Sequence, residues 1–142
     1  MQMKKKNTDD LMESLSASDN LDSYMKENED SLIQESLSDY LDRLLAQKKK
    51  TKSEVIHACE CVEVTGYQIF SGTRNPSRNK LIAFAFGLEL NLEETNKMLK
   101  FAGFLPLYPK SKRDSILIYA IQHQENFLKV NERLYDAGEE TL

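Results

Sequence analysis

The chain has 142 residues, 40% of them hydrophobic and 30% charged, with a net charge of −4, which suits one compact domain of about 100 residues plus an appendage. A membrane span is excluded because no segment approaches the roughly 20 apolar residues that it requires. A disulfide scaffold is excluded because the only cysteines, Cys59 and Cys61, lie too close on one segment to bridge each other.

Charge is distributed unevenly along the chain. Residues 36–80 carry eight Lys or Arg against five acidic residues, whereas the segments on either side are net acidic. Residues 1–6 lead into an acidic stretch instead of a signal-peptide core. We therefore expect a soluble, cytoplasmic protein with no membrane partner, whose polyanion-binding surface, if it has one, lies within residues 36–80.

Apolar residues recur at helical spacing, and no segment alternates strictly between apolar and polar residues, so we predict an all-α protein. Residues 1–35 form an acidic arm in which Ser, Asn and Asp dilute the helix propensity. For this arm, short helices and a solvated tail that docks weakly both remain open. One hypothesis is that the arm screens the basic segment or steers it away from non-target polyanions.

Two capping boxes predict the first firm helix starts. Ser36 pairs with Asp39, and Thr51 pairs with Glu54, each ahead of an apolar run at helical spacing. The first of these helices ends in Lys48, Lys49 and Lys50, which favour the negative end of a helix dipole and form either a solvated helix end or a phosphate contact.

A third helix is predicted to begin after Cys61 and to reach Phe70, with Gly72 as its stop. The segment 73–76 is then a loop, because its last residue is proline and the residue before a proline avoids helical geometry. Ser77 caps a fourth helix, from Arg78 to about Gly87, and its apolar composition predicts a central position.

The C-terminal half contains an internal repeat with an offset of 35 residues. Each unit is predicted to be a helix, a short link, a second helix and a glycine stop, and an extended connector at 105–109 joins the units. We expect three parts: an acidic arm at 1–35, a helical domain at 36–104, and a duplicated helical hairpin at 105–142 packed on that domain. The identical pairs are Ala85 and Ala120, Asn91 and Asn126, Asn96 and Asn131, Leu99 and Leu134, Ala102 and Ala137, and Gly103 and Gly138.

The capped helix at Thr51, the second helix ending in the letters QIFSG and the loop GTRNPS together resemble the lambda-repressor/Cro-type helix-turn-helix family, over about residues 36–99. The resemblance implies a lambda-repressor-like helical bundle that binds double-stranded DNA and regulates bacterial transcription. In such proteins the helix after the turn lies in the major groove, and flanking groups hold phosphates.

The resemblance also assigns candidate contact residues. Gln68 matches a bidentate contact to adenine, and Tyr67 or Val64 matches packing against a thymine methyl group. The candidates for base contacts are Val62, Glu63, Val64, Tyr67, Gln68 and Ser71. The candidates for phosphate contacts are Lys52, Thr73, Arg74, Asn75 and Arg78.

Several positions depart from the family pattern. Ile56 stands where Ala is usual, and Gly66 stands where a bulky apolar residue is usual, so we predict that the two exchange volume across the helix pair. Glu60 replaces the turn glycine, and Val62 replaces the polar N-cap. Glu63 is repelled by phosphates unless it accepts a hydrogen bond from a cytosine amino group.

The sequence offers few candidate residues for metal binding or catalysis. His57 and Cys61 share a helix face, but no second pair of ligands occurs at metal-binding spacing, so two packed thiols are favoured over a zinc site and no cofactor is expected. There is no phosphate loop or nucleophile elbow, so we expect no enzyme. The alternative to DNA binding is a protein-interaction adaptor that keeps the fold, with a protein partner at the C-terminal hairpin or the acidic arm.

A homodimer is expected, because one short groove helix reads few bases alone. Four apolar residues of the second unit either form the dimer surface or pack on Phe84 and Phe86. They are Tyr119, Ile121, Phe127 and Leu134.

Overall fold

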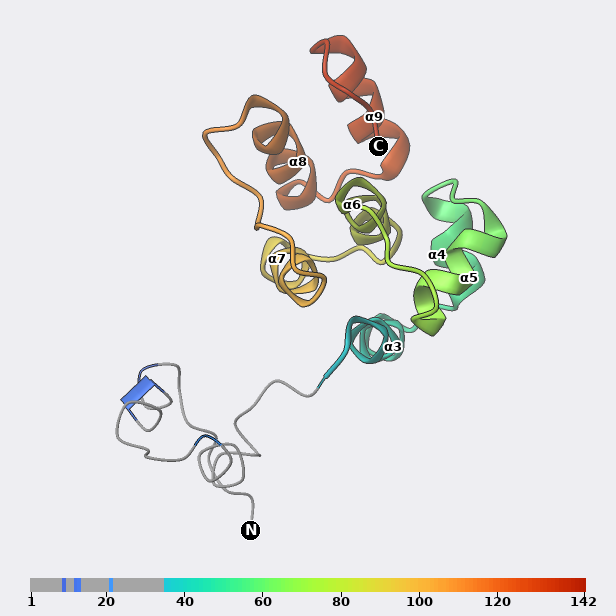
Figure 1. Cartoon of the computed structure of the whole chain (residues 1–142). Helices are drawn as coiled ribbons and strands as arrows, with labels where there is room; N and C mark the ends of the chain where they lie inside the picture. Colours follow the sequence, from blue (N-terminus) through green and yellow to red (C-terminus); the bar gives the residue numbers. More distant parts are fainter. Residues whose placement is uncertain (1–8, 10–11, 14–20, 22–34) are drawn as a thin grey trace. The chain divides into compact units, whose positions relative to one another are not determined.

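The computed structural model describes residues 9, 12–13, 21 and 35–142. Residues 1–35 and 36–142 form two units, which are described separately (Figure 1). All regular elements among the described residues are helices, which confirms the all-α prediction for this part of the chain. Residues 9, 12–13 and 21 are helical, and the prediction for the rest of the arm lies outside the described residues.

Residues 36–142 contain seven helices, and none of the described helices is long and apolar enough to cross a membrane. Their bounds are α3 Leu37–Lys48, α4 Lys52–Ala58, α5 Glu63–Ser71, α6 Arg78–Gly87, α7 Leu92–Phe101, α8 Lys112–Gln122 and α9 Phe127–Asp136.

The predicted helix starts of α3 and α4 are confirmed. The Ser36 and Thr51 side chains each accept the N–H of the third helical residue, and the carboxylate of that residue accepts the N–H of the cap. Helix α5 lacks this device because its N-cap is Val62, which makes no side-chain capping bond. Its end is as predicted, with Gly72 in the left-handed region at φ 82°.

Four of the helix connections share one three-residue turn. The first residue has a positive φ, the second donates its N–H back to the preceding helix, and the third is the N-cap of the next helix. Glycine is the preferred residue at the first position of such a turn, because a residue with a Cβ is strained at positive φ. The chain instead uses Lys49, Glu60, Glu89 and Gln124, with φ between 50° and 56°.

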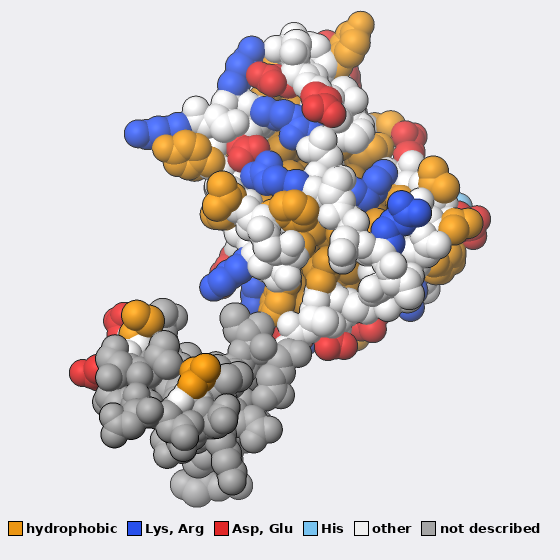
Figure 2. All heavy atoms as spheres, in the orientation of Figure 1, with side chains coloured by type: hydrophobic (Ala, Val, Ile, Leu, Met, Phe, Trp, Pro, Cys, Tyr) orange, Lys and Arg blue, Asp and Glu red, His pale blue; other side chains and the backbone are white. Residues whose placement is uncertain are grey.

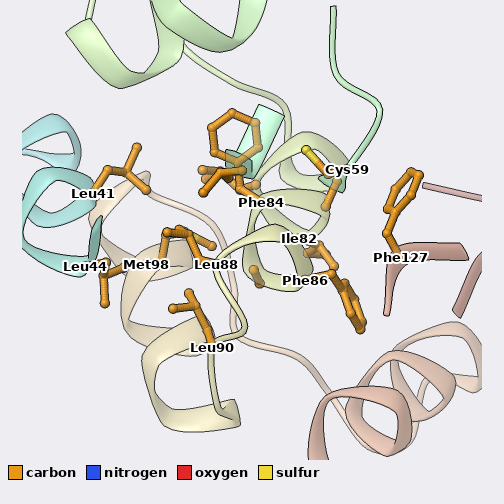
Figure 3. Packing of buried hydrophobic residues seen from close by; sticks show 14 of the residues in the cluster. Leu41, Leu44, Cys59, Ile82, Phe84, Phe86, Leu88, Leu90, Met98 and Phe127 are labelled. Atoms are coloured by element: carbon orange, nitrogen blue, oxygen red, sulfur yellow. The ribbon is translucent and has the colours of Figure 1, made fainter. Parts of the chain in front are cut away.

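Helix α6 lies in the middle of this unit, with the other helices around it (Figure 1). All its residues from Leu81 to Gly87 are buried. Figure 3 shows Phe86 on the side of Phe127, whereas Leu41 and Met98 lie on the opposite side. The prediction of a central apolar helix is confirmed because α6 buries its whole circumference.

Residues 35 positions apart make equivalent hydrogen bonds in the two C-terminal hairpins. The Asn96 side chain accepts the backbone N–H of Leu107 at 2.9 Å, and that of Asn131 accepts the N–H of Leu142 at 2.7 Å. Asn91 and Asn126 are both N-caps, and Gly103 and Gly138 both have positive φ. These three pairs of residues therefore have the same local roles in the two segments.

The apolar residues considered for a dimer surface are mostly in the core. Ile121, Phe127 and Leu134 are at most 6% exposed, whereas Tyr119 is 46% exposed. For these three residues the packing alternative is confirmed, and the dimer-surface alternative is wrong because their side chains are covered within one copy of the chain.

Candidate nucleic-acid interface

Helix α4 packs closely against two glycines, Gly66 of α5 and Gly87 of α6. A Cβ placed on Gly66 of α5 would lie 2.5 Å from Cγ1 and 2.7 Å from Cδ1 of Ile56. A Cβ on Gly87 of α6 would lie 2.8 Å from the carbonyl oxygen of Val55. The predicted exchange of volume between Ile56 and Gly66 is confirmed, and it sets the close approach of the α4–α5 pair.

Helix α5 has one buried face and one exposed face. Gly66, Ile69 and Phe70 are buried, and the Ser38 hydroxyl of α3 donates to the carbonyl of Phe70. Gln68 is partly exposed. The other base-contact candidates, Val62, Glu63, Val64, Tyr67 and Ser71, are all exposed.

The loop after α5 folds back onto Gln68. The Gln68 carbonyl accepts the backbone N–H groups of Thr73 and Arg74 at 3.0 and 3.3 Å, and it also accepts from the hydroxyls of Ser71 and Thr73. Gly72 makes this reversal possible through its positive φ. The loop therefore holds Thr73 and Arg74 in fixed positions at the end of α5.

The phosphate-contact candidates have different surroundings. Thr73, Arg74 and Asn75 are exposed, and Lys52, the first residue of α4, is partly exposed. The Arg74 Nε donates to Oε1 of Gln68 at 2.8 Å. Thus one base-contact candidate and one phosphate-contact candidate are directly joined.

Arg78 is partly exposed, but its guanidinium is hydrogen-bonded to other residues of the chain. Its Nη1 and Nη2 groups donate to both carboxylate oxygens of Asp114 on α8, at 3.3 and 3.0 Å, and it also donates to the carbonyls of Leu105 and Pro106. Burial would raise the pKa of Asp114, but the Arg78 guanidinium and the Tyr108 N–H outweigh it and hold the pKa below its ordinary value. We leave Arg78 out of the interface for this reason.

A related contact runs in the opposite direction between the same helices. Arg113, which is 35 residues after Arg78, donates from Nη1 to the side-chain oxygen of Asn79 at 2.9 Å. Asn79 is in turn 35 residues before Asp114, but it offers one oxygen where the aspartate offers two. Nη2 of Arg113 is buried and has no hydrogen-bond partner. Both pairs join positions related by the repeat offset of 35 residues, but neither contact was predicted from the sequence.

The lysines that end α3 make ion pairs. Lys48 contacts Glu94 at 2.9 Å, and Lys50 contacts Glu89 at 3.4 Å. These two cations pair with acidic residues at the turn before α7 and in its first turn, so we do not include them in the interface.

The cysteines have an apolar environment. Cys59 and Cys61 are buried, and burial, reinforced by the neighbouring Cys61, raises the pKa of Cys59 to about 11. Cys59 is therefore a neutral thiol at pH 7. The described residues contain no group of three or more metal-binding side chains.

Lys and Arg side chains recur across one face of residues 36–142, with hydrophobic side chains between them (Figure 2). At the start of α5, the exposed side chains are Glu63 and two valines, Val62 and Val64, which are 68% and 66% exposed. The candidate interface is thus mixed, with an apolar and acidic start of α5 and a basic, hydroxyl-rich end.

The link between Gln68 and Arg74 was not predicted from the sequence. The two residues are six positions apart across a glycine stop, and only a loop that folds back on the helix brings them together. Comparisons of the chain with protein-family models, curated proteins and solved structures found no match.

Proposed function

We propose that the chain is a sequence-dependent DNA-binding protein of the lambda-repressor-like class that regulates bacterial transcription from the cytoplasm. In this proposal α4 and α5 form the helix-turn-helix, α5 lies in the major groove, and the hairpin α8–α9 is a second copy of the α6–α7 unit. The observation that carries the proposal is the exposed face of α5, which continues into a loop that fixes Arg74 beside it. A reading helix needs this combination of accessible side chains and an adjacent basic anchor.

The chemistry of the exposed groups supports the proposal. Lys52 and Arg74 supply positive charge, and Asn75 supplies a neutral hydrogen-bond donor, which are group types that contact phosphates. Tyr67, 40% exposed, retains the aromatic surface for contact with a thymine methyl group.

The test is fluorescence anisotropy with a random-sequence DNA duplex at several salt concentrations. Arg74→Ala or Lys52→Ala should each weaken binding and reduce the slope of log K against log salt by about 0.9. Lys100→Ala is the matched control, because it removes one exposed cation from α7, and its slope should equal that of the unchanged protein. If neither interface variant alters the slope, the assigned face is wrong.

An adaptor that recognises a protein is the second candidate. It is favoured by the exposed valines Val62 and Val64 and by Glu63, which present an apolar and acidic surface at the start of α5. Such a surface suits a basic, partly apolar partner segment. If the unchanged protein binds no duplex at low salt, DNA binding is refuted and the adaptor proposal is favoured.

A further inference from the structure

The hydrogen bond between Gln68 and Arg74 changes which groups the end of α5 presents to a ligand. Oε1 of Gln68 accepts from Nε of Arg74 at 2.8 Å. That oxygen is the only acceptor of the Gln68 side chain, and the guanidinium has no acceptor. Apart from the second lone pair of that oxygen, the groups left over are the Gln68 amide N–H₂ and the two terminal Nη groups of Arg74, all of which are donors.

The loop builds this pair before any ligand arrives. The carbonyl of Gln68 accepts the backbone N–H groups of both Thr73 and Arg74, so the backbone of residue 74 is held beside residue 68. Bonds from the Ser71 and Thr73 hydroxyls to the same carbonyl stiffen the reversal. A side chain fixed in this way loses less conformational entropy on binding.

No ion pair engages Arg74 within residues 36–142. Its terminal fork, Nη1 and Nη2, can therefore donate two parallel hydrogen bonds to one ligand. In Arg78, by contrast, Nη1 and Nη2 already donate to the carboxylate of Asp114.

The Arg74 fork distinguishes between the purines. In the major groove guanine presents two acceptors, N7 and O6, whereas adenine presents the acceptor N7 beside the donor N6 amino group. A glutamine that pairs with adenine must offer its oxygen to N6, and here Nε of Arg74 already uses one of the two lone pairs of that oxygen. Two parallel donors from the guanidinium match the two acceptors of guanine and not the acceptor–donor pair of adenine.

We propose that Gln68 and Arg74 form a guanine-reading unit, in which Nη1 and Nη2 of Arg74 donate to N7 and O6 and Gln68 positions the guanidinium. This inference rests on the proposed DNA-binding function. Phosphate oxygens offer the same acceptor chemistry, so the experiment must separate a base contact from a backbone contact.

The experiment first selects a preferred duplex from a random-sequence library with the full chain. Each guanine in that duplex is then replaced by 7-deazaguanine, which has a C–H in place of the N7 acceptor, and affinities are measured by anisotropy. The unchanged protein should lose about 5- to 150-fold at the guanine that the pair reads.

Arg74→Lys is the decisive variant because lysine keeps the charge but lacks the fork. It should keep the salt dependence of binding and reduce the penalty at that guanine, because a single ammonium group cannot donate the two parallel bonds of the fork. Gln68→Ala should reduce the same penalty, and Gln68→Glu, which keeps an acceptor for Nε, should restore it relative to Gln68→Ala. Lys100→Ala should leave the penalty unchanged.

Two results overturn the inference in different ways. If Arg74→Lys retains the affinity of the unchanged protein and no 7-deazaguanine penalty depends on residue 74, the arginine holds a phosphate and the base contact is refuted while DNA binding stands. If the unchanged protein selects and binds no duplex at low salt, the inference falls together with the proposed function.

Discussion

The contact between Gly66 and Ile56 makes a sharp test of the α4–α5 packing. Replacing Gly66 by Ala should gain roughly 1 kcal/mol of helix propensity. The added Cβ would lie 2.5 and 2.7 Å from two carbons of the buried Ile56 side chain, far inside the ordinary carbon–carbon separation of about 3.5–4.0 Å. Overpacking of this kind costs about 1–3 kcal/mol, so we expect Gly66→Ala to lower the free energy of unfolding by up to about 2 kcal/mol.

The sign should reverse when the obstacle is removed. Ile56→Ala alone should cost about 2–5 kcal/mol because it leaves a cavity. In that background Gly66→Ala meets no side chain from residue 56, so its propensity gain of roughly 1 kcal/mol should appear. The coupling free energy between the two sites should then equal the overpacking cost of about 1–3 kcal/mol.

The assay is urea denaturation followed by helical circular dichroism for the unchanged protein, both single variants and the double variant. Val64→Ala on the same helix is the control, because Val64 is 66% exposed and its small propensity gain should be equal in both backgrounds. If Gly66→Ala stabilises the unchanged protein, or has the same effect in both backgrounds, the packing argument is refuted.

Three further substitutions test the charges and turns. Asn79→Asp should raise the free energy of unfolding by about 1–2 kcal/mol, because a second oxygen would accept from the unpartnered Nη2 of Arg113; a loss would mean that desolvation of the new carboxylate dominates. Glu60→Gly should gain about 0.5–1 kcal/mol by relieving the φ of 50°, and a decrease in the urea midpoint would contradict this strain. Asp114→Asn should cost about 1.5–3 kcal/mol at pH 7. The folded-state pKa of Asp114 is depressed, so this stabilisation is present above about pH 4 and is lost as the pH falls through the lowered pKa. Urea titrations at several pH values should show a shallower acid dependence for the Asn variant, and unchanged dependence would refute the role of Asp114.

Local rules predicted the helices well because capping acts within a few residues. Ser36 and Thr51 find their partners three positions along the chain, and Gly72 ends α5 through its own backbone conformation. The buried circumference of α6 also followed from composition alone. These features do not depend on how the helices dock.

Contacts between distant segments were not predictable in the same way. Arg78 lies beside the loop after α5, which made it a phosphate-contact candidate. Its guanidinium instead donates to Asp114 of α8, 36 positions away. The sequence offset relates the two hairpins but does not reveal which faces meet. The Gln68–Arg74 bond is local, but it depends on the loop folding back across Gly72 and on the rotamers of two long side chains, which spacing along the sequence does not specify.

Arg78 is bonded to Asp114, and this limits how tightly one copy of the chain would bind DNA. Without Arg78, the proposed interface contributes at most two cations per copy, Lys52 and Arg74. Counterion release then gives a slope of about −1.8 for log K against log salt, which is only about a 12-fold loss of affinity between 50 and 200 mM salt. Two copies on one duplex would double the slope, and the loss becomes about 150-fold. Because the whole chain carries a net charge of −4, a single copy gains little from general attraction to DNA. Under the proposed function we therefore propose that two copies of α5 bind adjacent half-sites.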